Sequence, residues 1–100
     1  MKSELFAKII DLVSQVTELS TEQIMSKTKT DDLVAARSLF VHYCVKFGLP
    51  SVSIAAYLCR RKTNSVNRYL SAYNSFYKSS YYFREMDSHI ASLLSPHLSR

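Results

Sequence analysis

Apolar residues recur at helical spacing along most of the chain. In residues 3–16 one face carries Leu5, Phe6, Ile9, Leu12, Val13 and Val16. Residues 82–95 repeat the pattern with Phe83, Met86, Ile90, Leu93 and Leu94. Spacings of three and four residues are typical of amphipathic helices that bury one face. We therefore expect two helices whose apolar stripes join a core, the second ended by Pro96.

Residues 31–47 are apolar nearly all round, which predicts a helix buried on most sides at the centre of the fold. The polar interruptions are few, and the last three form a single strip at a spacing of four: Arg37, Ser38, His42 and Lys46. Thr30 suits the N-cap of this helix. Gly48, the only glycine, stands where a C-cap belongs.

Three further helices are predicted over residues 21–25, 51–57 and 62–79. The first begins with a capping box, with Ser20 as N-cap and Gln23 three residues later. Ser51 suits the N-cap of the second. The third carries an apolar stripe at helical spacing: Val66, Tyr69, Leu70, Tyr73 and Tyr77.

Composition supports an all-α fold. The chain of 100 residues is 47% hydrophobic, with one Gly and two Pro. That length suits one domain with a packed core, and turn residues are scarce. We predict a single domain over residues 1–100, a compact bundle of five to six helices around the central one.

The distribution of charge is uneven. The formal net charge is +5, yet no acidic residue occurs between Leu33 and Arg84. The same span holds eight cations: Arg37, Lys46, Arg60, Arg61, Lys62, Arg68, Lys78 and Arg84. An acid-free basic region attracts polyanions. The alternative is a basic protein without a nucleic-acid partner.

The segment 49–78 reads as a short helix, a turn with three consecutive cations and a long helix. The long helix is polar on one face, with Asn64, Asn67, Arg68, Ser71, Asn74 and Lys78. A basic turn leading into such a helix suits a DNA major groove. The loop 26–30 carries Lys27 and Lys29, and is either a plain connector or a contact to phosphates or the minor groove.

This order of elements resembles the C-terminal DNA-binding domain of the bacterial replication initiator DnaA, over roughly residues 5–95. Residues 24–29, IMSKTK, are similar to the family's basic loop LLSKxR. Ala36-Arg37 is similar to its AR or PRQ step. Residues 58–66, LCRRKTNSV, fall on its signature FGGRDHTTV, of which Arg61 and Val66 are retained.

The resemblance implies a helix-turn-helix that binds duplex DNA, and it distributes roles by position. Lys29 enters the minor groove. The base-reading positions are Lys62, Thr63 and Asn64, and the phosphate-binding positions are Arg37, Arg61, Ser65 and Arg68. The basic residues Lys27, Lys46 and Arg60 complete the expected DNA-binding set. The protein would then regulate transcription or replication, without the nucleotide-binding module of the initiator, since no GxxxxGK[ST] motif occurs.

The histidines, the cysteines and an aromatic-rich stretch bear on other classes of function. No metal-ligand spacing or nucleophile motif surrounds His42, His89 or His97. We therefore expect that the protein is not an enzyme and that it binds no cofactor or small-molecule substrate. Cys44 and Cys59 suit reduced thiols, and without a signal peptide or membrane span we expect a cytoplasmic protein. The aromatic-rich stretch 73–83 leaves two alternatives open, a homodimer or protein-partner surface and an RNA-binding one.

Overall fold

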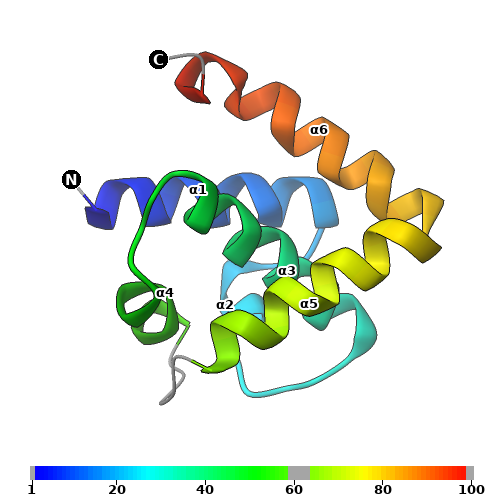
Figure 1. Cartoon of the computed structure of the whole chain (residues 1–100), viewed down its shortest axis with the longest axis horizontal. Coiled ribbons are helices and arrows are strands. Elements are labelled where there is room, and N and C mark those ends of the chain that lie inside the picture. The colour runs from blue at the N-terminus through cyan, green and yellow to red at the C-terminus, as the bar shows by residue number, and fades with distance from the viewer. Residues whose placement is uncertain (1, 59–63, 99–100) are drawn as a thin grey trace.

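The helix α3 (Asp31–Lys46) is the centre of the fold in a computed structural model, which describes residues 2–58 and 64–98 (Figure 1). It lies between α1 (Lys2–Thr17) behind it and α5 (Asn64–Ser79) in front of it, and packs against both. Ten of its sixteen residues are buried, including Leu39, Phe40 and Val41. The prediction of a central, buried helix is therefore confirmed.

Three other helices surround this centre: α2 (Thr21–Ile24), α4 (Ser51–Tyr57) and α6 (Tyr81–Leu98). The helices α2 and α4 both contact α3, while α6 packs against α1 and α5. The described residues contain no β-strand. The fold is an all-α helical bundle, as predicted.

The ends of α3 are closed by local hydrogen bonds. The Thr30 hydroxyl accepts from the backbone N–H of Leu33 at 3.3 Å, as an N-cap should. At the other end Gly48 has φ 82°, its N–H donates to the carbonyl of Val45, and the N–H of Leu49 donates to the carbonyl of Cys44. These two bonds form a Schellman motif, which needs a left-handed residue at Gly48. The helix thus ends at Lys46, one residue before the predicted end.

One predicted N-cap and one predicted helix end are wrong. Pro50, not Ser51, is the N-cap of α4, and Ser51 is its first helical residue. The helix α6 also runs past Pro96 to Leu98. A proline lacks the backbone donor, but within the last turn this removes only one hydrogen bond of the helix. By contrast, the capping box of α2 is confirmed, with both Ser20–Gln23 bonds formed.

The core combines the stripes of α1 and α6 with α3. From α1 it receives Phe6, Ile9, Ile10 and Val13, and from α6 Phe83, Ile90 and Leu94. One residue of the predicted α6 stripe is misplaced: Leu93 is 41% exposed. No helix within residues 2–58 and 64–98 combines the length and the apolar character needed to cross a bilayer.

Candidate nucleic-acid interface

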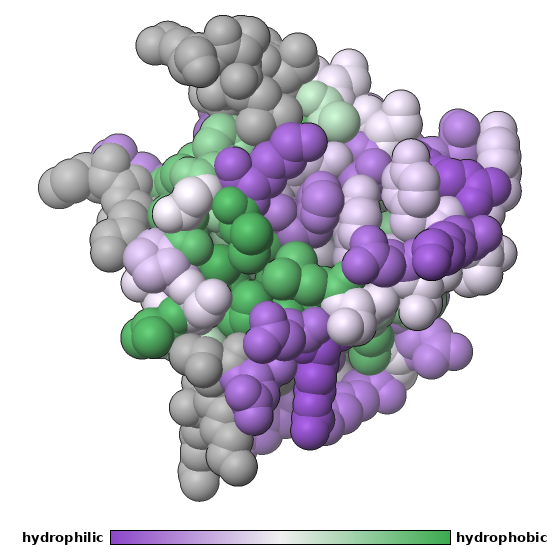
Figure 2. Space-filling model, in the orientation of Figure 1, coloured by the Kyte–Doolittle hydropathy of each residue, from purple (hydrophilic) through white to green (hydrophobic). Residues whose placement is uncertain are grey.

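The helix α5 has two distinct faces. Val66 is buried on one of them, and Tyr69, Leu70 and Tyr73 are partly buried against the core. The six residues of the predicted polar face are all exposed: Asn64, Asn67, Arg68, Ser71, Asn74 and Lys78. In Figure 2 hydrophilic side chains lie along α5 on the front of the molecule. This face carries amide, hydroxyl and cationic groups and no carboxylate.

The helix α4 packs against the core next to α5. Its Ile54 and Ala55 are buried, and so is Leu58 just after its end. The helix contacts both α3 and α5, and Figure 1 shows it near the beginning of α5. Four predicted DNA-binding residues of the connecting segment lie outside the described residues: Arg60, Arg61, Lys62 and Thr63.

Arg37 does not belong to this surface. Its side chain is 0% exposed, and its Nε donates to the carbonyl of Ile24 at 2.6 Å. Its Nη2 donates to the carbonyls of Ser26 at 2.7 Å and Gln23 at 3.3 Å. The prediction of a phosphate contact is therefore corrected, because a fully buried guanidinium cannot reach a phosphate. Arg37 instead donates to carbonyls at the end of α2 and to that of Ser26 just beyond it, and such terminal carbonyls lack partners within the helix.

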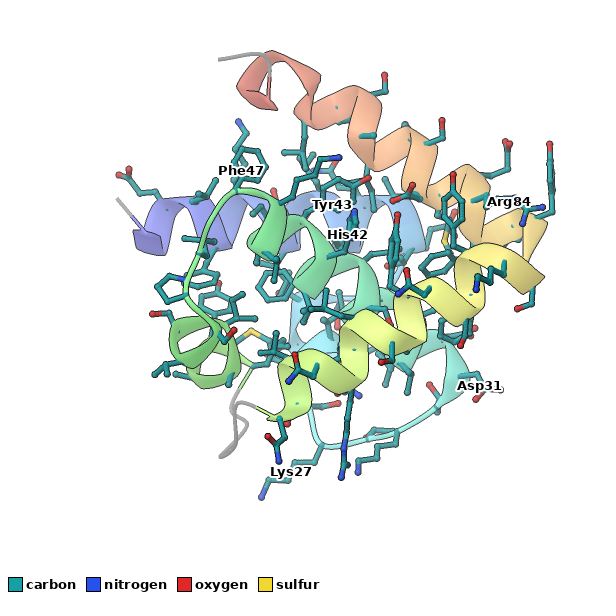
Figure 3. All side chains as sticks on the ribbon, in the orientation of Figure 1. Lys27, Asp31, His42, Tyr43, Phe47 and Arg84 are labelled. Carbon is teal, nitrogen blue, oxygen red and sulfur yellow. The ribbon has the colours of Figure 1, made fainter. Side chains whose placement is uncertain are left out.

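That anchoring fixes the start of the basic loop between α2 and α3. The Ser26 hydroxyl donates to the carbonyl of Gln23 at 2.6 Å and accepts from the N–H of Thr28 at 3.4 Å. Lys27 and Lys29 are exposed. Figure 3 shows Lys27 pointing away from the bundle, at the same edge of this view as the beginning of α5. The loop and α5 are both attached to α3, the loop through Arg37 and α5 by packing.

The other predicted contacts are distributed along α5 and α3. Asn64 and Arg68 are exposed on the first two turns of α5, and Ser65 is half-buried beside them. Lys46 is exposed in the last turn of α3. It lies beside the second half of α5, where it lines a groove together with Asn74 and Lys78. Of these predicted contacts, Asn64, Ser65 and Arg68 lie on the first turns of α5, whereas Lys46 lies beside its second half.

The groove has an aromatic wall, and the sequence did not predict that its residues lie together. The rings of His42 and Tyr73 stack with centroids 3.8 Å apart and planes within 2°. The Tyr73 and Tyr77 centroids are 5.8 Å apart. The Tyr43 hydroxyl donates to Oδ1 of Asp87 at 2.7 Å, which links α3 to α6. The one signal in the sequence was the polar strip on α3, of which Ser38 is fully buried while His42 and Lys46 reach the groove.

Burial and Asp87 together set the protonation states around this groove. Burial raises the pKa of the Tyr43 and Tyr73 phenols, and their hydrogen bonds to the Asp87 carboxylate raise it further. Burial lowers the pKa of His42, an effect that Asp87 opposes and Lys46 reinforces. At neutral pH the phenols are therefore protonated donors and His42 is a neutral ring.

The aromatic stretch 73–83 is only partly core. Phe83 is buried and stacks on Phe76 with centroids 5.2 Å apart. Tyr77, which belongs to the predicted apolar stripe of residues 62–79, is 44% exposed, and Tyr81 and Tyr82 are 70% and 68% exposed. The Arg84 Nη1 donates to the carbonyl of Tyr77 at 2.6 Å, which closes the corner between α5 and α6.

No family model, curated protein or solved structure matches this chain.

Proposed function

We propose that this protein binds duplex DNA, with α4 and α5 acting as a helix-turn-helix and α5 entering the major groove. The observation that carries the proposal is the exposed face of α5, which is polar, basic at Arg68 and Lys78, and free of acids. An α-helix fits the major groove, and DNA repels carboxylates while attracting cations. Packing of α5 on the central α3 holds this face rigidly.

The side chains on the first turns of α5 suit base edges. Asn64 and Asn67 lie one turn apart on the exposed face. An asparagine can donate to N7 and accept from N6 of adenine, and each such bidentate pair discriminates against a wrong base by ~1–3 kcal/mol. Arg68, on the same face, would contact phosphate or guanine. The predicted contacts Arg61, Lys62 and Thr63 belong to the same proposal.

The loop with Lys27 and Lys29 supplies the second contact. Arg37 secures the carbonyls at its start, so the two exposed lysines project from an anchored backbone. Such a loop would contact phosphates or the minor groove beside the major groove that α5 occupies. The role that fits this arrangement is regulation of transcription or replication in the cytoplasm, in the manner of the DnaA C-terminal domain that the sequence resembles.

The double variant Lys27→Ala/Lys29→Ala tests this proposal. We expect wild-type protein to bind labelled duplexes, with log K falling linearly with log salt concentration. We expect the variant to weaken binding to all sequences alike. We also expect the slope of log K against log salt concentration to fall by about the amount due to two phosphate contacts. Fluorescence anisotropy at several salt concentrations measures both quantities. An unchanged slope would make residues 26–30 a plain connector, and no duplex binding by wild type would refute the function.

A protein-interaction surface is the second candidate. It is favoured by Tyr81 and Tyr82, which are largely exposed at the corner of α5 and α6. Tyrosine is enriched at protein interfaces. Wild-type protein without affinity for any nucleic acid would favour this reading.

A further inference from the structure

We propose that the groove between α3, α5 and α6 binds one unpaired nucleotide of a single nucleic-acid strand. The base would stack on Tyr77, and the adjoining phosphates would contact Lys46 and Lys78. This goes beyond duplex binding and does not depend on it.

The groove continues the polar face of α5. Its lining includes Asn74 and Lys78 from that face, with His42 and Lys46 from α3 and Asp87 from α6. Its volume is about 460 Å³, within the range of small-molecule sites. A strand that follows α5 toward its C-terminal end would therefore meet this groove.

Part of the aromatic surface in the wall of the groove remains exposed. His42 and Tyr73 cover one another at 3.8 Å, whereas the neighbouring Tyr77 is 44% exposed and lies 5.8 Å from Tyr73. Proteins that bind single strands stack successive bases on such side chains, and any base can serve because each has a π-face.

The wall is also held in place. The Asp87 carboxylate accepts from the hydroxyl of Tyr43 at 2.7 Å, so α6 braces a ring of α3. This bond engages the negative charge of Asp87, which also lines the groove beside Tyr73. An incoming base would find a preformed surface, which lowers the entropy cost of binding.

The charge of the groove favours a nucleic-acid backbone. Lys46 and Lys78 are exposed cations that line it, against the single carboxylate of Asp87. A duplex offers phosphates but keeps its base faces covered by neighbouring base pairs. A site that combines lysines with an exposed ring is therefore matched to an unpaired nucleotide.

The variant Tyr77→Leu tests the inference, with Tyr77→Phe and Tyr81→Leu as matched controls. Phenylalanine retains the ring, and Tyr81 is an exposed tyrosine that does not line the groove. Labelled oligothymidylate and oligouridylate of about ten nucleotides, and a labelled duplex, serve as probes by fluorescence anisotropy. Thermal melts establish that each variant is folded.

We expect Tyr77→Leu to weaken binding of a single strand about tenfold, the effect of one lost base stack, and to leave duplex affinity within about twofold. We expect both control variants to bind single strands like wild type. Binding of either oligonucleotide supports the inference, and a preference between them reports contact with the 2′-hydroxyl. Unlabelled thymidine monophosphate, followed by tyrosine emission, distinguishes a free nucleotide from a strand.

Three results would overturn the inference: no binding of single strands by wild type, equal affinity of wild type and Tyr77→Leu, or binding of the mononucleotide alone. Failure of duplex binding, with single-strand binding retained and sensitive to Tyr77→Leu, would instead refute the proposed duplex function and leave this inference standing.

Discussion

Replacing Phe40 by alanine is expected to lower the free energy of unfolding by ~3–5 kcal/mol. Phe40 has no exposed surface and lies in the middle of α3. Its ring centroid is 6.2 Å from that of Phe6 on α1 and 5.7 Å from that of Tyr57 on α4. The truncation would therefore leave a cavity where three helices meet. Domains of this size have a stability of only ~5–15 kcal/mol.

Urea denaturation followed by circular dichroism measures this loss. Val52→Ala is the matched control, because it also truncates an apolar side chain of the bundle but at a position 68% exposed on α4. We expect the control to change stability by about 0.5 kcal/mol or less. A Phe40→Ala variant as stable as the control would show that the centre of the fold is misassigned.

Replacing Arg37 by methionine is expected to destabilise the protein and to loosen the loop of Lys27 and Lys29. The buried guanidinium donates to three carbonyls, two at the end of α2 and that of Ser26 just beyond it. Leaving buried carbonyls without a donor costs about 1–3 kcal/mol each, partly offset by removing a buried charge. We therefore expect a loss of roughly 2–4 kcal/mol.

Urea denaturation gives the stability of this variant, and amide hydrogen exchange gives the opening of residues 24–29. Arg37→Lys is the informative companion, since a lysine keeps the charge but lacks the planar fork that serves several carbonyls. We expect it to recover only part of the loss. A stable Arg37→Met protein with unchanged exchange but weaker DNA binding would return Arg37 to the role of a phosphate ligand.

The elements that local patterns determine could be predicted from the sequence. The capping box at Ser20 and the glycine end at Gly48 depend on residues a few positions apart. The two faces of α5 follow from helical periodicity, so its polar residues were placed correctly. The apolar character of α3 likewise predicted its central position.

What depends on distant partners could not be predicted. A single arginine in an apolar helix suits either a phosphate contact or a buried hydrogen-bond donor. Arg37 is a buried donor because the carbonyls of Ile24 and Ser26 lie next to it in the fold. The groove joins His42, Tyr73 and Asp87 from three helices, and no spacing in the sequence relates them. Leu93 belongs to the predicted stripe of α6 but is 41% exposed, and helical spacing alone does not distinguish it from the buried Ile90 and Leu94.

The central claim is that duplex DNA binds the polar face of α5. The most direct test compares Arg68→Glu on that face with Lys8→Glu on α1. Both residues are exposed, and each change removes one positive charge and adds one negative charge, so the formal net charge falls from +5 to +3 in both.

Duplex affinity by fluorescence anisotropy, at about 0.1 M salt so that the Debye length is ~10 Å, distinguishes a local contact from overall charge. We predict that Arg68→Glu weakens binding at least about tenfold, equivalent to ~1.4 kcal/mol, while Lys8→Glu changes it by no more than about twofold. Equal losses in the two variants, or full affinity in Arg68→Glu, would contradict the assignment of α5 as the DNA-binding helix.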